Sequence, residues 1–514
     1  MSDSLRDMHD VAVVGFGPSG AVAAGLLASY GLSTFVCDRS TQVYDKPRAI
    51  AVDHEILRVF QQIGVIEQVE PDVEPFTPSE YFGVDGQLIR RMTMIDPPYP
   101  LGYTPSNVFT QPIVEQKLRD RVSGMPGVTT ALGWEVKRVE QDEESVELQL
   151  QDAAGVQRRI RARYLVACDG ASSGIREAMG LELEDLAFDE PWLVVDVLAN
   201  DRGLAKLPKT SVQYCDPERP SSFLIGPGRH RRWEISLKEG EDPQHAATPE
   251  RTWELLSRWI DPADGELWRQ ASYRFHALVA RQWRRGRVFI AGDAAHQQPP
   301  FLGQGMCQGI RDVANLSWKL RAVLRGEVAP QAVEALLDSY GIERGEHVRQ
   351  LTARIKDIGA VICERDPERA RARDAHLLAQ GGGVVVDTPR QDVIPRLEHG
   401  LLSTGQSAAR GTLFPQPWLV DGGERRRFDQ LAGDGWLLVR RPGLAHGADA
   451  AAGRLKPHTL QLPEAAEPDG LLAAWFERNG CVAALVRPDR YVFGTAERIE
   501  DEEGLVREAA ASYG

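Results

Sequence analysis

The sequence has few cysteines, and none is placed where it would build a metal site or a disulfide framework. Its 514 residues include six cysteines, which lie far apart with no CxxC pair and no neighbouring histidine. Closely spaced cysteines are what structural zinc sites and small disulfide-linked domains require. We therefore expect neither a metal site nor a disulfide framework.

Long apolar segments and an excess of basic residues are also missing. No run reaches the roughly 18 apolar residues that a membrane-spanning helix needs, and residues 1–10 are polar and acidic, unlike a signal peptide. The formal net charge is −14, whereas a nucleic-acid-binding surface requires clustered basic residues. We therefore expect a cytoplasmic protein with no membrane or nucleic-acid partner.

Only one dinucleotide fingerprint is present, and it stands close to the N-terminus. Residues 15–20 read Gly-Phe-Gly-Pro-Ser-Gly between an apolar segment, 10–14, and a run of small residues, 21–30. Strand, turn and helix in this order place a pyrophosphate at the helix N-terminus. The residues expected at the cofactor are Gly15 for the tight turn, Gly17 for close backbone approach, Gly20 for helix packing, and Pro18 and Ser19 between them.

An acidic residue follows at the distance expected for a ribose contact. The apolar segment 34–38 ends in Asp38, which lies 18 residues beyond Gly20 and is followed by Arg39. A carboxylate at the end of the second strand can accept hydrogen bonds from an adenosine ribose. The segment from residue 10 to residue 39 therefore predicts a dinucleotide site.

Two further glycine-centred segments indicate the rest of a large cofactor site. Residues 168–176 contain Asp169-Gly170 and end in Arg176, and residues 291–296 contain Gly292-Asp293 and end in His296. An aspartate after a buried strand can bind a ribityl hydroxyl, and the positive end of a following helix suits the N1–C2 edge of a flavin. The loop and helix start expected to line that edge contain Pro299, Gly303, Gly305 and Met306.

The length predicts more than one domain, because a single hydrophobic core stops growing at about 250–300 residues. The pattern of apolar residues predicts helices over 47–60, 111–121, 312–320 and 471–478. It predicts strands over 146–150, 163–168, 192–197, 211–214, 232–237, 435–439, 481–486 and 491–493. The polar segment 364–374 and the glycines at 381–383 indicate a linker.

Together these segments resemble the single-component FAD-dependent aromatic hydroxylases. The resemblance covers about residues 8–360 and includes the fingerprint, Asp38, the Pro47-Arg48-Ala49 segment and Gln111, followed by the second and third glycine-centred segments in family order. Within that family, residues 47–55, 192–196 and 485–491 look most like the 3-(3-hydroxyphenyl)propionate hydroxylase group. Members of that group carry a thioredoxin-like C-terminal domain, but here it lacks a CxxC, so we expect no redox activity from it.

The resemblance implies an α/β fold with a Rossmann-like FAD-binding domain, an inserted β-sheet substrate domain and a C-terminal thioredoxin-like domain. The corresponding boundaries are 1–75, 105–186 and 285–363 for FAD binding, 76–104 and 187–284 for substrate binding, 364–384 for the linker and 385–514 for the last domain. It also implies that Arg48 and Gln111 contact FAD, that Asp169 and Gly170 serve FAD and the nicotinamide cofactor, and that Arg176 holds their loop.

The activity that the resemblance implies is hydroxylation of a phenolic compound by FAD, NAD(P)H and O2 through a flavin C4a-hydroperoxide. FAD supplies the redox chemistry, and the protein supplies orientation and a dry pocket. The aromatic substrate resembles 3-(3-hydroxyphenyl)propionate, a simple phenol or resorcinol, and a homodimer is expected. A base or acceptor should lie near the phenolic oxygen, since loss of its proton makes the ring a better nucleophile.

Several residues are candidates for that acceptor, and each has a structural explanation as well. They are Asp53, His54, Asp196, Tyr214 and His296. Arg231 or Arg232 is a candidate partner for a substrate carboxylate, and Trp192, Phe301 and Leu302 are candidate pocket walls. Helix capping, sheet support and core packing are the competing roles.

Other functions remain open at the level of sequence. A tailoring hydroxylase or epoxidase of a polycyclic natural product has the same fold. A flavin-binding redox sensor would bind FAD without turnover stimulated by substrate, and a flavin dehydrogenase would turn over without inserting oxygen. The sequence does not decide between NADH and NADPH.

Overall fold

The fingerprint segment lies at the centre of a largely parallel sheet. In the computed structural model, which describes residues 8–444 and 452–514, β1 pairs in parallel with β2 on one side and with β11 on the other. The sheet order is β17-β18-β11-β1-β2-β8, with the β9–β10 hairpin on β11. The bounds are β1 Met8–Val14, β2 Thr34–Asp38, β8 Val128–Leu132, β9 Trp134–Gln141, β10 Val146–Asp152, β11 Gln157–Ala167, β17 Arg284–Arg285 and β18 Val288–Ile290.

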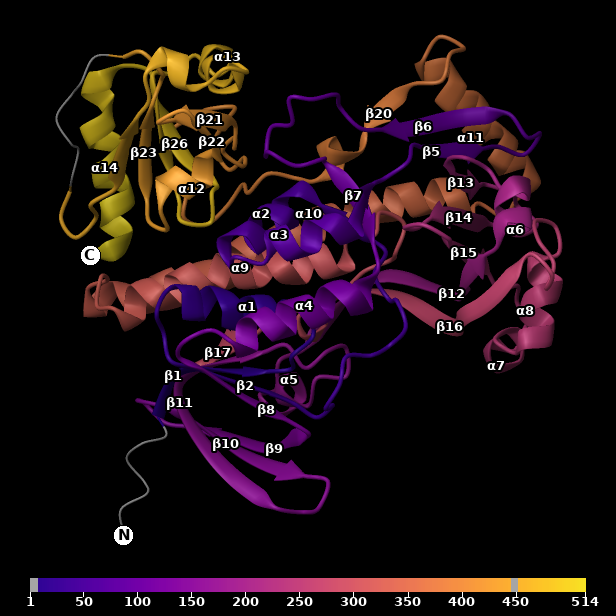
Figure 1. Ribbon diagram of the computed structural model, residues 1–514, viewed down its shortest axis with the longest axis horizontal. Coiled ribbons are helices and arrows are strands. Elements are labelled where there is room, and N and C mark those ends of the chain that lie inside the picture. Colours follow the sequence, from indigo (N-terminus) through magenta and orange to yellow (C-terminus); the bar gives the residue numbers. More distant parts are fainter. Residues whose placement is uncertain (1–7, 445–451) are drawn as a thin grey trace.

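Helices cover this sheet and bury its apolar strands. Helix α1 packs on β1 and β2 and also contacts α4 and α9. Strand β1 is therefore covered and contains the unbroken buried run Val11 to Val14. Figure 1 shows α9 and α10 crossing the molecule between the sheet and the C-terminal residues. The helices of this region are α1 Pro18–Ser29, α2 His54–Gln62, α3 Ile66–Val69, α4 Gln111–Ser123, α5 Gly174–Ala178, α9 Gly305–Leu324 and α10 Val333–Cys363.

A second, nine-stranded sheet stands beside the first. Its order is β19-β16-β12-β15-β14-β13-β5-β6-β20, and most of its pairs are antiparallel. Helices α6 Asp201–Lys206, α7 Pro243–Ala246 and α8 Pro249–Leu256 accompany it. The strands are β5 Ser79–Phe82, β6 Leu88–Thr93, β12 Leu183–Ala199, β13 Ser211–Tyr214, β14 Ser221–Ile225, β15 His230–Ser236, β16 Gly265–Ala280, β19 His296–Gln297 and β20 Asp387–Pro389.

The two faces of the second sheet differ in chemistry. One face is apolar and contains Val212, Phe223 and Trp233, which form a core cluster with residues of α8. Their neighbours along the strands point to the opposite face, because side chains alternate along a strand. We call this opposite face the inner face and define it by Gln213, Ser222, Leu224, Arg232 and Glu234, which pair across β13, β14 and β15.

The inner face lies over a small three-stranded sheet that belongs to the first half of the chain. Leu224 packs in one cluster with Ala51 and Phe76. The small sheet has the order β3-β7-β4, with bounds β3 Ala51–Asp53, β4 Val73–Pro75 and β7 Ser106–Phe109. This contact places the inner face next to residues 47–53.

The helix predicted over 47–60 is partly wrong, because residues 51–53 form strand β3 and the helix α2 begins only at His54. Asp53 ends the strand and caps the helix, since its side chain accepts a hydrogen bond from Ile56 N at 3.2 Å. The apolar spacing of the segment identified the helix but not the residue at which it begins.

The segment predicted as a linker contains a helix. Helix α11, Pro367–Gln380, begins after Asp366, whose side chain accepts hydrogen bonds from Glu368 N and Arg369 N. Asp374 on this helix accepts a hydrogen bond from Val84 N at 2.8 Å, which ties α11 to the hairpin of β5 and β6. The charged residues of this segment predict a linker. In the structure they form a capped helix that packs on the second sheet.

The C-terminal residues form a separate mixed unit, drawn in orange and yellow in Figure 1. Its main sheet has the order β24-β23-β25-β26, with β23 parallel to β24 and antiparallel to β25. The thioredoxin-like assignment stays a prediction. The bounds are β21 Trp418–Asp421, β22 Glu424–Arg427, α12 Phe428–Ala432, β23 Leu437–Arg440, β24 His458–Gln461, α13 Leu471–Arg478, β25 Ala483–Val486, β26 Val492–Ala496 and α14 Glu502–Ala510.

All six cysteines are free thiols. In the described residues, no group of histidine, cysteine and acidic side chains is arranged to hold a metal ion. Within the same residues, every helix is too short or too polar to cross a membrane.

Candidate functional site

The turn between β1 and α1 needs its glycines for steric reasons. Gly15 has φ +93°, and a Cβ there would lie 2.2 Å from the carbonyl oxygen of Cys168 at the end of β11. A Cβ on Gly20 would lie 1.8 Å from the oxygen of Gly15. At Gly17, in contrast, a Cβ would meet no atom within 4 Å. The backbone is therefore tightly packed toward the sheet and open at the helix N-terminus.

That open end of α1 suits an anion. Gly17 is the N-cap and provides no side-chain cap, Pro18 occupies the first turn, and the turn contains no acidic residue. The free N–H groups and the positive end of the helix dipole are therefore not neutralised by a side chain of this turn. Ser19 lies where α1 packs closely on α9, because a Cβ on Gly309 would lie 2.3 Å from its Oγ.

Asp38 lies beside this turn and helps to shape it. Its carboxylate accepts hydrogen bonds from Phe16 N at 2.7 Å and from Ser40 N at 2.8 Å. The side chain is half-buried, whereas Arg39 is exposed. The ribose contact of Asp38 and any cofactor contact of Arg39 stay predictions.

The second glycine-centred segment is tied to the third. Asp169 accepts hydrogen bonds from Ser173 Oγ at 2.5 Å and Ile175 N at 3.2 Å, and burial raises its pKa. Arg176 donates to the carbonyl oxygens of Ala171 at 3.0 Å and Ala294 at 3.2 Å. Arg176 therefore joins the loop of Asp169 to the segment that contains Asp293, while a Cβ on Gly170 would meet open space.

The side chain of Asp293 is accessible to solvent, although the surrounding protein is close enough to desolvate its carboxylate. The residue is exposed, and its carboxylate forms no hydrogen bond or ion pair with a described residue. Desolvation by the surrounding protein raises its pKa, and the charges of His296 and Arg48 oppose that rise. An unpartnered carboxylate in a desolvated position is suited to accept a hydrogen bond from a polyol ligand.

His296 is directed into the core, away from this carboxylate. Its Nε2 lies 2.7 Å from Oδ2 of Asp312, which also accepts a hydrogen bond from Gly292 N at 2.9 Å. Arg344 donates to the other oxygen of Asp312 at 2.9 Å. His296 therefore braces the loop around Gly292, and this position speaks against the catalytic role that we predicted for it.

The side-chain amide of Gln111 is hydrogen-bonded to residues 48–49 and to Glu115, so few of its donor and acceptor positions remain for a cofactor. Its Oε1 accepts hydrogen bonds from Arg48 N at 3.1 Å and Ala49 N at 2.6 Å, while its amide donates to Glu115 at 3.1 Å. The side chain of Arg48 is exposed and stacks on Tyr44 at 5.1 Å. Arg48 is thus free to contact a cofactor, and Gln111 positions it.

Asp196 and Arg232 hold the same segment from the inner face. Arg232 donates to Asp196 at 2.7 Å and to the carbonyl oxygens of Arg48 at 2.7 Å and Pro47 at 3.2 Å. Asp196 is completely buried and also bonds His230 at 2.7 Å, and the charge of Arg232 contributes to its lowered pKa. Both partners are fully used, so neither is placed to bind a substrate as we predicted.

Four other predicted residues do not lie on the inner face of the second sheet. Asp53 is buried and pairs with Arg311 at 2.5 Å, and burial lowers the pKa of His54 to about 4, so that it is neutral. Tyr214 lies on the apolar face of the second sheet, where its ring packs on Trp259 at 5.4 Å. Arg231 donates to the main-chain oxygens of Gly226, Gly228 and His230.

The loop before α9 lies against the segment 47–53. Gly303 has φ +64°, and a Cβ there would approach Cβ of Ala51 to 2.9 Å. Gly305 begins α9 and faces open space, Met306 is half-buried, and Pro299 is buried. Since no side chain caps α9, its N-terminus is a second open site for a partially negative group.

All three predicted pocket walls are core residues. Phe301 packs edge-on against Trp192 with ring centroids 5.6 Å apart, and both belong to one core cluster with Leu302. Gly359 of α10 permits this packing, because a Cβ there would lie 2.6 Å from the ring of Phe301. These side chains anchor the loop before α9 in the core.

The sequence prediction missed the polar row of the inner face. Ser222 Oγ donates to Gln213 Oε1 at 2.5 Å, and Ser222 pairs with Glu234 across β14 and β15. Glu234 is 5% exposed and forms no hydrogen bond or ion pair with a described residue. Its burial raises its pKa to about 7. Strand alternation could have identified this row, since Gln213 precedes the predicted Tyr214.

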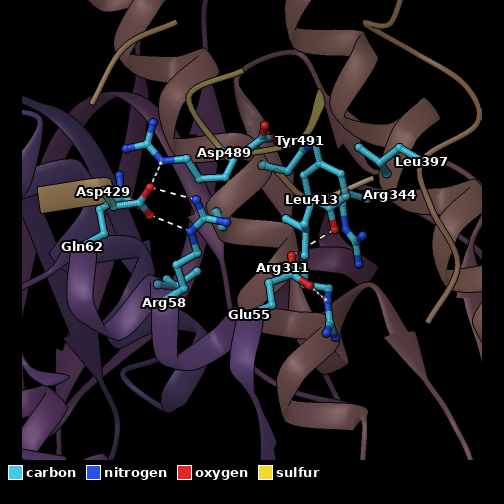
Figure 2. Close-up of a pocket in the computed structure, with 14 residues that line it drawn as sticks. Glu55, Arg58, Gln62, Arg311, Arg344, Leu397, Leu413, Asp429, Asp489 and Tyr491 are labelled. Carbon is cyan, nitrogen blue, oxygen red and sulfur yellow. Dashed lines mark hydrogen bonds and ion pairs between the residues drawn. The ribbon is translucent and has the colours of Figure 1, made fainter. Parts of the chain in front are cut away.

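Figure 2 shows the residues that line a small cavity between α2, α9 and the C-terminal unit. Arg58 and Arg490 pair with Asp429 at 2.6 and 3.2 Å, and Tyr491 donates to Glu55 at 3.0 Å. The cavity holds about 20 Å³, which suffices for one water molecule and not for an aromatic substrate. These pairs fasten the C-terminal unit to α2.

Comparison with known proteins agrees with this geometry. Residues 8–355 match a family described as FAD binding domain, and residues 411–511 match the HcaD C-terminal domain. A probable NADH-specific resorcinol 4-hydroxylase of Rhodococcus jostii (strain RHA1) is 36% identical and covers 99% of this chain and 96% of its own. A 3-(3-hydroxy-phenyl)propionate/3-hydroxycinnamic acid hydroxylase of Burkholderia cenocepacia (strain HI2424) is 33% identical and covers 96% and 94%.

Solved structures share the whole fold. The flavin-dependent monooxygenase PieE, in complex with FAD and substrate, superposes with a TM-score of 0.81 at 21% identity and covers 99% of both chains. Aklavinone-11 hydroxylase with FAD and aklavinone gives 0.79 at 24% identity, also over 99% of both chains. At these identities the likeness concerns the fold alone.

Proposed function

Because this chain belongs to the family of FAD-dependent aromatic hydroxylases, we propose that it hydroxylates a single-ring phenolic compound with NADH and O2 as co-substrates. Resorcinol and 3-(3-hydroxyphenyl)propionate, the compounds named for the two relatives, are the substrates to test first. Both are much smaller than the polycyclic compounds of the tailoring-enzyme hypothesis, so the relatives favour the main hypothesis over that one.

The described residues fit FAD at several points. The open N-terminus of α1 suits the pyrophosphate, Asp38 the ribose, Asp293 the ribityl chain and the N-terminus of α9 the flavin edge. When bound, FAD accepts electrons from NADH and activates O2 for transfer to the aromatic ring. We assign Arg48, Gly170 and the glycines at 303 and 305 to the surface that receives the ring system.

The observation that carries the proposal is the unpartnered carboxylate of Glu234 on the inner face. Arg232 and Leu224 of that face contact residues 47–51, and Gly303 also lies against Ala51. The inner face and the loop before α9 therefore border the same region. An aromatic substrate between them would meet the flavin edge on one side and Gln213, Ser222 and Glu234 on the other.

The proposal is tested with FAD-loaded protein. NADH oxidation is followed with and without each of the two phenols, NADPH is compared in parallel, and the mass of the aromatic product is measured. Stimulated oxidation with a product one oxygen heavier supports the hydroxylase. Stimulation without oxygen insertion by either phenol contradicts the proposed substrates, and no stimulation by any phenol favours the redox-sensor hypothesis.

Replacing Asp293 by alanine should weaken FAD binding. Loss of one hydrogen bond to a ribityl hydroxyl costs about 1–3 kcal/mol, which corresponds to a roughly 5- to 150-fold higher dissociation constant. Flavin fluorescence titration of the apoprotein measures it. Asp357→Ala, an exposed position on α10, is the matched control and should leave the constant unchanged. An unchanged constant for Asp293→Ala would remove the ribityl assignment.

Glu234 is the hydroxyl acceptor in this proposal. Because burial raises its pKa to about 7, the carboxylate is protonated at acidic pH and becomes an acceptor as the pH rises through 7. We expect kcat/KM for hydroxylation to rise with pH over that interval in the unmodified enzyme. Glu234→Gln should remove this rise and lower the rate about 100-fold, the low end of the range for general-base catalysis.

The control for this variant is Glu218→Gln, because Glu218 is exposed and pairs only with Lys238. It should retain both the rate and the pH profile. A Glu234→Gln enzyme with the same ascending limb as the unmodified enzyme would show that another group accepts the proton. Bound FAD, measured by absorbance in each variant, separates this effect from loss of the cofactor.

We further propose a cytoplasmic homodimer, as the family resemblance implies. The proposed use of NADH supports the cytoplasmic location, because NADH is available in the cytoplasm. Light scattering coupled to size-exclusion chromatography would measure the assembly.

A further inference from the structure

Arg390 lies between the edge of the second sheet, Phe76 and the loop that precedes α9. It follows β20, which pairs in parallel with β6 at the edge of the second sheet. Its Nη2 donates to the carbonyl oxygen of Leu302 at 2.8 Å, directly before Gly303. Its guanidinium lies over the ring of Phe76 at 4.3 Å. The side chain therefore reaches from the second sheet to the loop that precedes α9.

The charge of Arg390 is not neutralised by the described residues. Each of the ten buried arginines in the described chain has a carboxylate within 4 Å, whereas Arg390, which is half-buried, has none. These ten are Arg58, Arg119, Arg176, Arg232, Arg269, Arg311, Arg344, Arg440, Arg487 and Arg490. A desolvated cation without a counterion is costly, so the position favours an anion.

A comparison with Arg231 shows that main-chain oxygens do not replace the missing anion. Burial lowers the pKa of both arginines. Arg231 donates to three carbonyl oxygens, whereas Arg390 donates to one. The guanidinium of Arg390 carries five N–H donors in a rigid plane, and stacking on Phe76 holds that plane. Donors therefore remain for a second acceptor.

Building on the proposed function, we propose that Arg390 binds an anionic oxygen of the aromatic substrate. Two sources supply this chemistry, the carboxylate of an acidic side chain and an ionised ring hydroxyl. A planar guanidinium suits either, since it can form two parallel hydrogen bonds to a carboxylate or a charge-assisted bond to a phenolate. The phosphates of FAD belong to the N-terminus of α1 and do not compete for this position.

The position of Arg390 also explains a feature of the chain that the domain prediction does not. After α10 the chain returns through α11 to add β20 to the second sheet, and Arg390 follows immediately. Tyr81 of the same sheet lies near Arg390, whose positive charge opposes the rise that burial causes in the pKa of Tyr81. Residues predicted as the beginning of the last domain therefore supply a substrate contact.

The test is the binding of three ligands to FAD-loaded protein, measured by the change in flavin absorbance. The ligands are 3-(3-hydroxyphenyl)propionate, its neutral analogue 3-(3-hydroxyphenyl)propan-1-ol, and resorcinol. Arg390→Met should weaken binding of the propionate about 10- to 100-fold, the range for hydrogen bonds to a charged group, and leave the alcohol within about 3-fold if the carboxylate is the source. If the ionised hydroxyl is the source, all three weaken together and the phenolate absorbance of bound ligand disappears.

Arg396→Met is the matched control, because Arg396 is exposed in the same segment and donates only to the carbonyl oxygen of Ala408. It should bind all three ligands as the unmodified protein does. If Arg390→Met fails to fold or to retain FAD, Arg390→Lys replaces it, since lysine keeps the charge and loses the planar fork. The lysine variant should lose at least 5-fold in affinity for the same ligands.

Unchanged affinity for every ligand in a folded, FAD-loaded Arg390 variant would overturn the assignment. That result is distinct from failure of the proposed function. If the unmodified enzyme hydroxylates a phenol and the variant binds it equally well, only the role of Arg390 is wrong. If the unmodified enzyme hydroxylates none of the ligands, the proposed function is wrong, whatever the binding data.

Discussion

Gly15→Val is expected to yield a protein that no longer retains FAD. The backbone at Gly15 has φ +93°, which β-branched residues rarely adopt, and a Cβ would lie 2.2 Å from the carbonyl oxygen of Cys168. That oxygen belongs to the main chain at the end of β11, so it cannot rotate away. Accommodation would separate β1 from β11 and displace both the open end of α1 and the loop of Asp169.

The measurement is the ratio of flavin to protein absorbance after purification, followed by reconstitution with excess FAD. Gly240→Val is the matched control, because Gly240 also has a positive φ of +81° but a Cβ there would meet nothing within 4 Å. It carries the same backbone strain, about 1–2 kcal/mol, without the clash. A Gly15→Val protein that purifies with a full complement of FAD would refute the fingerprint assignment.

Arg311→Met is expected to destabilise the protein more than any surface substitution. Arg311 is buried and donates to Asp53 and Glu55, each at 2.5 Å, and to Gln304 at 2.8 Å. Its loss would leave two carboxylates buried without a cation. Breaking a buried pair in this way costs about 3–5 kcal/mol, because the remaining charge stays desolvated.

The same substitution should loosen the loop before α9, since Gln304 is its N-cap residue. Urea unfolding followed by fluorescence measures the loss of stability, and a parallel FAD titration measures the effect on the site. Arg498→Met is the control, because the Arg498–Asp501 pair is exposed and screened by solvent. It should unfold at the same urea concentration as the unmodified protein. If Arg311→Met does so too, the ion pairs of Arg311, of which the one to Glu55 is drawn in Figure 2, contribute nothing net.

Local patterns predicted most of the elements. The strand over 211–214 and the helix over 471–478 are confirmed to the residue, because a strand has period two and a helix a period near 3.6 within a few residues. The helix over 47–60 failed at its first half, where pairing with β7 stabilises a strand at 51–53. That pairing joins residues more than fifty positions apart, which no local pattern reports.

The candidate site shows the same division. Asp196 and Asp53 were reasonable as acceptors from the sequence, yet Arg232 and Arg311 occupy them, and these arginines come from distant elements. The sequence does not single out Glu234 or Arg390, because neither lies in a motif. They stand out only in the folded protein, where neither side chain has an ion-pair partner among the described residues.

The sequence by itself determined the family, the class of cofactor and the glycine-containing turns that we propose as its site. These depend on glycines and acids at fixed spacing, and backbone conformation at Gly15 or Gly303 is a local property that the residue type dictates. Only the tertiary structure decided which polar side chains share the inner face of the second sheet. Neighbours such as Gln213 and Tyr214 point to opposite faces, and whether a buried charge is already paired is settled by strands and helices that are remote in sequence.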